Sequence, residues 1–354
     1  VERLLARRPR IVGFGVYIWN VEETTKIVAM LKRVAPEVTV VLGGPEVSHE
    51  TNEQEICRLA DYVVTGWGDV TFPKLCAEIL HGPKPLMKVH AGVQPPMAEI
   101  ALPYSLYSAE DIAHRTIYVE ASRGCPFKCE FCLSSLDKTA WPFPLDDFLA
   151  QLDDLHARGA RLFKFVDRTF NLNVKTSQRI MQFFLDKLAA NPDDPVYAHF
   201  ELVPDHLPEA LKETIARFPA GALQFEIGIQ SFNGEHLKAL GRIHDEREAL
   251  RAVEIARSTF ENFNLDLMYA LPSQTLEQAQ RDLQTALSFA PPHLSLYHLT
   301  MEPNTVFAKY PPQLPDDDAS ADMQDMIAEV TAAAGFEHYE ASAYAQPGRR
   351  ARHK

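Results

Sequence analysis

The sequence contains no run of 18 or more apolar residues, which is about the length that a membrane-spanning helix needs. Its first residues include no apolar stretch of the kind found in secretory signal peptides. Hydrophobic residues make up 46% of the chain and charged residues 23%, as in ordinary globular proteins. We therefore expect a cytoplasmic globular protein that has no membrane partner.

Positive charge is also scarce. The chain has 35 Lys and Arg against 48 Asp and Glu, which gives a formal net charge of −13, and the basic residues form no stripe. Binding to a nucleic-acid backbone requires clustered Lys and Arg, so we expect no nucleic-acid partner. One basic cluster occupies residues 349–354, and we interpret it as a solvated terminus.

Cysteine is infrequent and unevenly spread. The chain has five cysteines, and three of them lie within eight residues. This odd number in a cytosol-like sequence is not typical of a disulfide framework. Cys57 and Cys76 stand alone in the helix-like segments 53–60 and 72–80, where a free cysteine usually serves as a small buried hydrophobe.

The first part of the chain alternates apolar strand-like segments with a helical period. Strands are expected at residues 10–17, 38–42 and 62–65, and a helix at 22–33. This alternation predicts an α/β domain over residues 1–82, with a parallel sheet of the Rossmann or flavodoxin kind. The proline-rich residues 83–111 are expected to form a linker.

The alternation resumes in residues 112–310 with six further strands. They are expected at 116–120, 162–166, 198–202, 223–229, 265–269 and 294–299, with helices at 145–157, 174–189, 208–217, 246–259 and 276–290. Six such units in series predict a partial (β/α)6 barrel of the TIM type, whose chemistry lies on loops at the carboxyl ends of its strands. Residues 311–354 are expected to form a C-terminal helical segment, with the acidic run 316–318 at the start of its helix.

A cysteine motif follows the first of these barrel strands. Cys125, Cys129 and Cys132 form the pattern CxxxCxxC, and three thiolates hold a [4Fe–4S] cluster while leaving one iron without a protein ligand. The open iron can chelate S-adenosylmethionine (SAM), and an electron passed to the sulfonium then yields a 5′-deoxyadenosyl radical. The alternative is a zinc site, but structural zinc normally takes four ligands and no fourth Cys or His lies nearby in the sequence.

With this motif in this place, the chain resembles the radical SAM superfamily. The resemblance implies that Phe131 packs against the adenine of SAM. It also implies that polar side chains at the strand ends position SAM. These are Asp167 toward the methionine amino group, Glu201 and Asp266 toward the ribose, Arg242 toward the carboxylate, and Gln230 with Ser231 at the end of the fourth strand.

Different parts of the chain resemble two branches of this superfamily. Residues 1 to about 230 resemble radical SAM proteins with a cobalamin-binding domain, on account of glycines at strand ends that let a backbone approach a large cofactor: Gly43, Gly44, Gly66 and Gly68. Residues from about 228 to 354 resemble oxygen-independent coproporphyrinogen III oxidase-like proteins, which include the heme chaperones. The segments that resemble this family include residues 266–272 and 292–297. A natural fusion, an engineered chimera or an assembly artefact would each place a junction near residues 228–233.

Both ends are expected to be truncated. A complete cobalamin-binding domain has about five parallel strands, whereas the sequence indicates three. The heme-related family continues beyond the segment that matches residues 311–354. His293 and His298 lie five residues apart on one strand and therefore point to opposite faces, so we do not expect them to share a metal or a heme.

These observations predict an enzyme that reductively cleaves SAM at a [4Fe–4S] cluster, with cobalamin as a further cofactor. The radical would abstract hydrogen from a small-molecule or tetrapyrrole substrate, or the cobalamin would transfer a methyl group to it. The electron would come from a donor such as flavodoxin or ferredoxin. The alternatives are a protein that binds heme or delivers it as a chaperone, and an inactive hybrid of two families.

Overall fold

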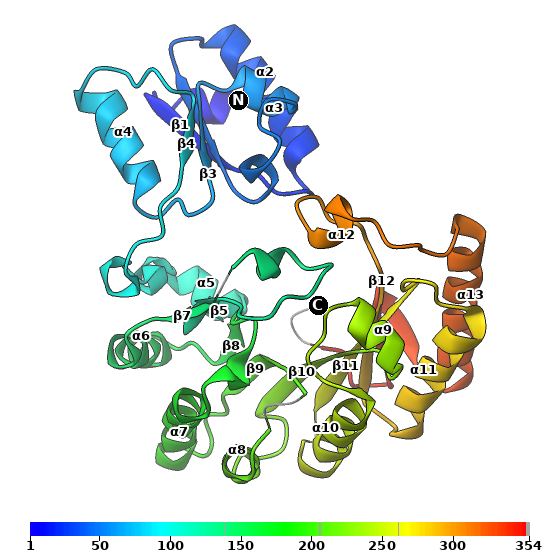
Figure 1. Cartoon of the computed structure of the whole chain (residues 1–354). Coiled ribbons are helices and arrows are strands. Elements are labelled where there is room, and N and C mark those ends of the chain that lie inside the picture. Colours follow the sequence, from blue (N-terminus) through cyan, green and yellow to red (C-terminus); the bar gives the residue numbers. More distant parts are fainter. Residues whose placement is uncertain (138, 205–206, 261, 352–354) are drawn as a thin grey trace. The chain divides into compact units, whose positions relative to one another are not determined.

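The computed structural model describes residues 1–137, 139–204, 207–260 and 262–351. The chain divides into two compact units, unit 1 (Val1–Ala101) and unit 2 (Leu102–Lys354). Each unit has its own sheet and its own hydrophobic core (Figure 1). The end of the basic cluster, residues 352–354, lies outside the described residues. Within the described part of the chain, no helix is long and apolar enough to cross a membrane.

Unit 1 contains a four-stranded parallel sheet in the order β1-β2-β3-β4. The strands are β1 (Ile11–Gly15), β2 (Thr39–Gly43), β3 (Tyr62–Thr65) and β4 (Val89–Ala91). The helices are α1 (Glu2–Leu5), α2 (Val21–Val34), α3 (Glu55–Leu59) and α4 (Thr71–His81), with short 3-10 helices η1 (Glu46–Ser48) and η2 (Met97–Glu99).

The fourth strand corrects the expectation of three. β4 lies inside residues 83–111, which the sequence indicates as a linker, and Val89 pairs in register with Val63 of β3. Three residues among prolines are too few to show a strand period, so only the pairing with β3 makes them a strand.

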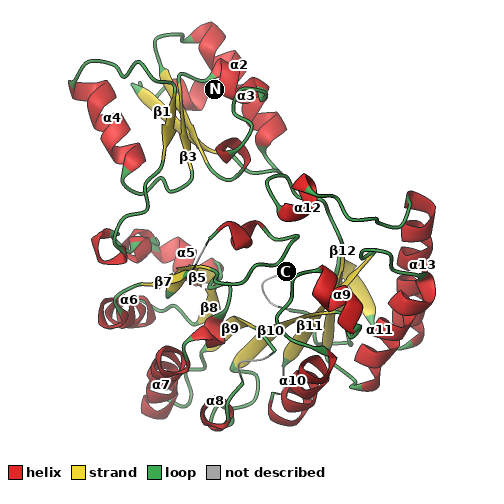
Figure 2. Ribbon diagram, in the orientation of Figure 1, coloured by secondary structure: helices red, strands yellow, loops and turns green. Residues whose placement is uncertain are grey.

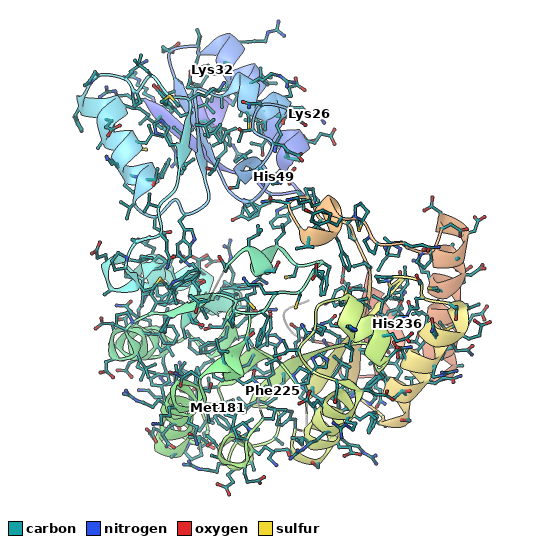
Figure 3. All side chains as sticks on the ribbon, viewed as in Figure 1. Lys26, Lys32, His49, Met181, Phe225 and His236 are labelled. Carbon is teal, nitrogen blue, oxygen red and sulfur yellow. The ribbon has the colours of Figure 1, made fainter. Side chains whose placement is uncertain are left out.

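Helix α2 packs on this sheet through one apolar face. Val28 and Leu31 are fully buried and belong to the same core cluster as Val40 of β2. On the same helix, Lys32 Nζ lies 2.8 Å from the carboxylate of Asp61, which also accepts a hydrogen bond from the Val40 N–H at 2.7 Å (Figure 3). The ion pair thus joins α2 to β2 and to the start of β3.

Unit 2 is built on an eight-stranded sheet in the order β13-β14-β12-β11-β10-β9-β8-β5. Its parallel strands are β5 (Ile117–Val119), β8 (Leu162–Phe165), β9 (Tyr197–Leu202), β10 (Leu223–Gln230), β11 (Phe263–Tyr269) and β12 (His293–His298). All six predicted barrel strands are therefore present. β5 and β13 form the two edges of this sheet, so the barrel is partial, as predicted.

Helices cover the outer face of this curved sheet (Figure 2). The helices of unit 2 are α5 (Ala109–His114), α6 (Leu145–Ala157), α7 (Val174–Ala190), α8 (Glu209–Ile215), α9 (Gly234–Ala239), α10 (Glu246–Thr259), α11 (Leu276–Ser288), α12 (Val306–Lys309) and α13 (Asp317–Ala333). Short 3-10 helices are η3 (Pro103–Leu106), η4 (Leu133–Leu136) and η5 (Phe170–Leu172). Asp316 caps α13 by accepting a hydrogen bond from the Ala319 N–H, as the acidic run predicts.

Two short antiparallel pairs were not expected in unit 2. The C-terminal segment is not only helical, because β13 (Glu337–Glu340) and β14 (Ala343–Ala345) form a hairpin that extends the sheet next to β12. The cysteine segment does not follow β5 directly, because β6 (Ser122–Gly124) intervenes and pairs with β7 (Ala140–Pro142).

The two faces of the unit 2 sheet differ in chemistry. The outer face carries a cluster of buried aromatic rings, including Phe165, Phe200 and Phe225, whose neighbouring ring centroids lie 4.6 to 6.0 Å apart. On the inner face the alternate residues of the same strands are polar, such as His199 and Glu226. Parallel strands of a barrel with one apolar face and one polar face leave the polar face for ligands or for internal hydrogen bonds.

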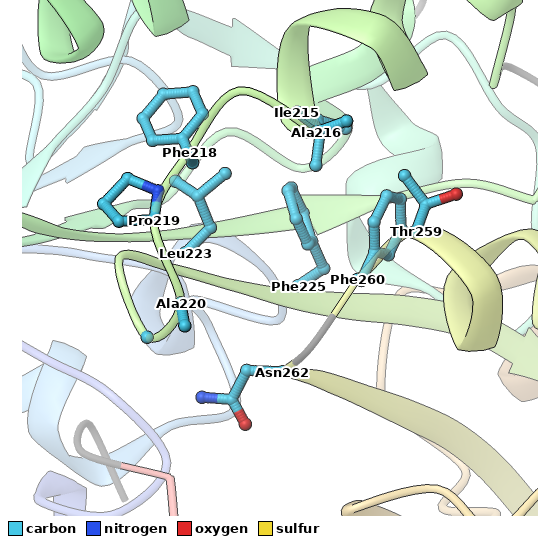
Figure 4. Close-up of a pocket in the computed structure, with 11 residues that line it drawn as sticks. Ile215, Ala216, Phe218, Pro219, Ala220, Leu223, Phe225, Thr259, Phe260 and Asn262 are labelled. Atoms are coloured by element: carbon cyan, nitrogen blue, oxygen red, sulfur yellow. The ribbon is translucent and has the colours of Figure 1, made fainter.

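A small apolar pocket of about 80 Å³ lies between α8, the end of α10 and the start of β10. Figure 4 shows the rings of Phe218, Phe225 and Phe260 around it. The pocket lies at the amino end of β10, whereas the cysteine loop follows the carboxyl end of β5. It is therefore not part of the candidate site.

Candidate functional site

The three motif cysteines lie on the loop between β6 and β7. Cys125 and Cys129 are 9% and 8% exposed, and Cys132 is half-buried. None of the three forms a disulfide. Burial raises the pKa of the Cys125 thiol, so this site favours a neutral thiol until a metal takes the proton's place.

The start of the cysteine loop is fixed by Asp167, which follows β8. Its carboxylate accepts hydrogen bonds from the Ala121 N–H at 2.9 Å and from the Ser122 hydroxyl at 2.7 Å. Burial raises the pKa of Asp167 to about 6. The sequence predicts a contact between Asp167 and the methionine amino group of SAM, but in the structure both carboxylate oxygens hold the chain that leads into Cys125. Asp167 therefore supports the start of the cysteine loop by holding Ala121 and Ser122.

The stretch of the loop around Glu130 packs on the segment after α9. The Glu130 N–H donates to the Leu240 carbonyl at 3.0 Å, and the Phe307 N–H donates to the Glu130 carbonyl at 3.1 Å. A Cβ on Gly241, whose φ is +68°, would lie 2.8 Å from the Lys128 carbonyl oxygen. The cysteine loop thus touches residues from two distant parts of the chain.

Arg242 joins the cysteine loop to the barrel. Its Nη1 lies 3.4 Å from Cys129 Sγ, and its Nη2 donates to the Gly228 carbonyl at 2.7 Å. Its Nε is buried and has no hydrogen-bond partner within the described chain. A guanidinium with a buried unused donor suits an anionic group such as a carboxylate, because a missing partner costs about 1–3 kcal/mol.

The end of β10 brings two further predicted residues toward Arg242. Gln230 has a φ of +68° and follows an irregularity in the pairing with β11, and its side chain turns back over Gly228. Asp266 pairs in register with Gly228. The structure therefore brings Gln230, Arg242 and Asp266 together around Gly228, next to Cys129.

Ser231 is not brought to this place. It is fully buried, its hydroxyl donates to Asp282 of α11 at 2.5 Å, and it accepts from the Asn233 N–H. The second Asp282 oxygen accepts from the Phe232 N–H at 3.0 Å. Ser231 thus holds the loop after β10 from behind, and Asp282 is a supporting residue that the sequence does not reveal.

Glu201 and Phe131 come from different elements, strand β9 and the cysteine loop. Glu201 is on the inner face and pairs in register with Glu226, which lies 3.5 Å from His199 Nε2. Phe131 packs against an apolar cluster at the carboxyl ends of β11 and β12, which includes Leu271. Both positions are at the carboxyl end of the sheet or just inside it, where the barrel argument expects ligand contacts.

The donor set around the loop fits a polynuclear cluster. Cys129 has a cationic neighbour in Arg242, and Cys125 lies close enough to Cys129 and to Cys132 for their charges to interact. Among the described residues no three His, Cys, Asp or Glu side chains could hold a metal ion. A [4Fe–4S] cluster spans several atoms, so its cysteines need not converge on one point.

The two strand histidines lie on opposite faces, as predicted. His293 is 1% exposed and bonds to neighbours on the inner face. His298 is exposed and packs edge-on against Tyr269.

Unit 1 has its own candidate site at the carboxyl ends of β1, β2 and β3. A pocket of about 380 Å³ opens there, and all four predicted glycines line it, together with Gly13, Gly15 and Phe72. Gly44 has a φ of +114°, and a Cβ on it would lie 2.4 Å from the Val16 carbonyl oxygen, so only glycine fits.

One side chain links the loops on this edge. The Ser48 hydroxyl donates to the Gly44 carbonyl at 2.8 Å and accepts from the Gly66 N–H at 3.0 Å. Gly13 and Gly15 were missed in the sequence, although glycines at alternate positions of a strand are a signal for close backbone approach.

Family comparisons agree with this division. The radical SAM superfamily model matches residues 119–286, and the B12-binding domain model matches residues 1–76. The first region contains the cysteine loop and four complete parallel strands, β8 to β11, and the second contains β1 to β3.

Two curated relatives are heme chaperones. The heme chaperone HemW of Escherichia coli (strain K12) is 39% identical over 240 residues, which cover 65% of this chain and 62% of that protein. The HemW of Haemophilus influenzae is 50% identical over 135 residues, 38% of this chain and 35% of that protein. The chain thus spans less than two thirds of either relative. The first match is longer than residues 228–354, so the likeness to HemW extends upstream of the expected junction.

A solved structure resembles both units. The radical SAM methyltransferase TsrM from Kitasatospora setae, solved with cobalamin and a [4Fe–4S] cluster bound, superposes with a TM-score of 0.67 at 16% identity. The match covers 86% of this chain and 65% of TsrM. At this identity the likeness concerns the fold. On these two family matches, the chain contains a B12-binding domain over residues 1–76 and a radical SAM domain over residues 119–286.

Proposed function

We propose that this chain reductively cleaves SAM at a [4Fe–4S] cluster held by Cys125, Cys129 and Cys132, and thereby starts radical chemistry. The observation that carries the proposal is Arg242, which connects Cys129 to the carboxyl end of β10, where Gln230 and Asp266 also lie. When bound, the cluster and SAM would supply a 5′-deoxyadenosyl radical.

The side chains around Gly228 would bind and orient SAM. Arg242 would pair with its carboxylate, for which the buried Nε is suited. Asp266 and Glu201 would accept hydrogen bonds from ribose hydroxyls, and Phe131 would pack against the adenine. Asp167 and Asp282 would keep the two flanking loops in place without touching SAM.

Cobalamin is the proposed second cofactor. The pocket at the carboxyl edge of unit 1 supports this, because glycines line it and leave backbone atoms accessible to a large ring system. The substrate would be a small molecule or a tetrapyrrole, and flavodoxin or ferredoxin would supply the electron.

Anaerobic reconstitution with iron and sulfide tests the cluster. We expect about four irons per chain and charge-transfer absorbance, and 5′-deoxyadenosine after reduction with SAM present. Ala at Cys125, Cys129 or Cys132 should abolish both signals. Cys57→Ala and Cys76→Ala are the matched controls, since these free cysteines lie in unit 1, and both should keep the signals. Wild-type protein without cluster absorbance would refute the proposal.

Cobalamin binding needs a separate test. Gly68 lines the pocket and has no positive φ, and a Cβ at this position would meet no heavy atom within 4 Å. Gly68→Leu therefore fills the pocket without straining the backbone. This variant should lose the cobalamin that co-purifies with wild type, while Gly234→Ala in α9 should retain it. Equal cobalamin content in wild type and Gly68→Leu would contradict this pocket as the site.

A heme-binding or heme-chaperone function is the second candidate. Identity of 39% to the E. coli HemW over 65% of this chain supports it. Titration of the purified protein with heme should then show a saturable Soret shift at one heme per chain. A linear, unsaturated response would exclude this candidate.

A further inference from the structure

A continuous chain of hydrogen bonds crosses the inner face of unit 2 from the C-terminal hairpin to Asp266. Tyr339 of β13 bonds through its hydroxyl to His293 Nε2 at 2.6 Å. His293 Nδ1 lies 2.6 Å from Asn264 Oδ1, and Asn264 Nδ2 donates to Asp266 Oδ1 at 2.7 Å. We call these four residues, Tyr339, His293, Asn264 and Asp266, the inner-face chain.

The donors and acceptors of the inner-face chain have one consistent direction. Asn264 Nδ2 donates to two acceptors, Asp266 Oδ1 and the Ser295 hydroxyl at 2.9 Å, so the Asn264 oxygen faces His293 as an acceptor. A neutral His293 therefore carries its proton on Nδ1, and its Nε2 accepts from the Tyr339 hydroxyl. The Tyr339 oxygen in turn accepts from the Ala351 N–H at 3.2 Å.

The middle of the inner-face chain is buried, which makes each of its hydrogen bonds costly to lose. Asn264 and Ser295 are 0% exposed and His293 is 1% exposed. Hydrogen bonds in such a low-dielectric interior polarise one another, and a buried partner left unpaired is costly. One carboxylate oxygen of Asp266 is therefore held by groups that reach back to the C-terminal hairpin.

These groups lie outside the part of the chain that the radical SAM model matches. That match ends at residue 286, whereas His293, Ser295 and Tyr339 come later. β14 nonetheless pairs with β12, with Ala345 opposite His293, so the hairpin is built into the same sheet.

We infer that Tyr339, His293 and Asn264 are positioning residues for SAM, and that the C-terminal hairpin is a functional part of the SAM site. The inference rests on the proposed function, because it acts through the contact of Asp266 with the ribose. Asn264 holds the Asp266 carboxylate toward the ligand, His293 holds Asn264, and Tyr339 holds His293 in the required tautomer.

Tyr339→Phe tests the inference, because it removes one hydroxyl and keeps the ring beside His293. SAM affinity is measured by anaerobic equilibrium dialysis of reconstituted protein, with iron content and thermal melting as checks. Loss of a neutral hydrogen bond predicts an affinity weaker by about two- to tenfold, with unchanged iron content. Tyr344→Phe on the neighbouring strand, buried in the outer core, is the matched control and should bind like wild type.

A double-variant comparison separates positioning from general stability. If Tyr339 acts through Asp266, Tyr339→Phe should weaken binding in wild type but not in Asp266→Asn. His293→Gln keeps one donor and one acceptor and should bind SAM better than His293→Leu. This pair of variants tests the inference even if Tyr339→Phe does not fold.

The outcomes distinguish the two levels of the proposal. If Asp266→Asn weakens SAM binding but Tyr339→Phe does not, the inference is wrong and the proposed function stands. If Asp266→Asn binds SAM like wild type, the role of Asp266 is wrong, and the inference fails with it. Additive effects of the two substitutions would also overturn it, because Tyr339 would then act by another route.

Discussion

Gly241 illustrates at the residue scale how the cysteine loop depends on a distant segment. The loop reaches the barrel through a backbone hydrogen bond from Glu130 to Leu240 and through close packing at Gly241. The loop can come this close only because residue 241 has no side chain. The same place in the chain supplies Arg242, which reaches Cys129.

We predict that Gly241→Ala lowers both stability and cluster content. The new Cβ would lie 2.8 Å from a backbone carbonyl of the loop, and an Ala at φ +68° costs about 1–2 kcal/mol. Iron analysis after reconstitution and chemical unfolding measure the two effects. Gly234→Ala is the control, since no atom lies within 4 Å of its Cβ and Ala favours helix α9. Equal iron content in the two variants would contradict the prediction.

At the scale of elements, loops after strands are held by carboxylates from elsewhere. Asp282 of α11 holds the loop after β10, and Asp167 after β8 holds the entry to the cysteine loop. Burial raises the pKa of each to about 6. Burying an ionised carboxylate lowers the stability of the fold. The two hydrogen bonds that each carboxylate accepts compensate for part of this loss.

The raised pKa of Asp282 should make the stability of the protein depend on pH. A folded pKa of about 6 lies above the ordinary 3.8, so between these values the folded state binds more protons and stability falls as pH rises. Asp282→Asn stays neutral; its oxygen can still accept from the Phe232 N–H, while its amide group would donate to the Ser231 oxygen. Relative to wild type it should gain up to about 3 kcal/mol between pH 4 and pH 7, measured by urea unfolding.

Asp245 provides a control of opposite sign for that measurement. It caps α10, and its hydrogen bond from the Glu248 N–H lowers its pKa. Its contribution is fully present above the ordinary pKa of 3.8 and is lost as the pH falls through the lowered folded pKa, so Asp245→Asn should destabilise the protein more at pH 7 than at about pH 2. A difference between wild type and Asp282→Asn that does not vary with pH would contradict the assigned cause.

At the scale of the whole molecule, the two units have separate cores. Val28, Leu31 and Leu42 belong to the core of unit 1, whereas the aromatic cluster around Phe200 belongs to unit 2. Each candidate site lies within one unit, the glycine-lined pocket in unit 1 and the cysteine loop in unit 2. Damage to one core should therefore affect mainly the cofactor of its own unit.

We predict that Leu42→Ala and Phe200→Ala act on different melting transitions. Both side chains are buried to about 1% exposure or less, so the substitutions should cost about 2–5 and 3–5 kcal/mol. Calorimetry should show a lower transition temperature for the unit that carries each change. Cobalamin retention should fall in Leu42→Ala and iron content in Phe200→Ala. An equal shift of all transitions in both variants would show that the units unfold together.

The sequence determined the longer elements and the cysteine motif, because both are local patterns. The three strands of unit 1, the six barrel strands and their helices have apolar periods long enough to read, and Cys125, Cys129 and Cys132 are close in the chain. Spacing also placed Gly43, Gly44, Gly66 and Gly68 at strand ends, where they share one pocket.

Only the tertiary structure decided how the polar residues divide. A strand-end position does not fix which neighbour a side chain meets, so Asp167 and Ser231 bond to neighbouring loops, while Arg242 and Asp266 lie beside Gly228. The sequence did not indicate β4 and β13; β4 is a strand because it pairs with β3, and β13 because it pairs with β14. Tyr339 and His293 of the inner-face chain are 46 positions apart, and only the folded sheet brings such groups within hydrogen-bond distance.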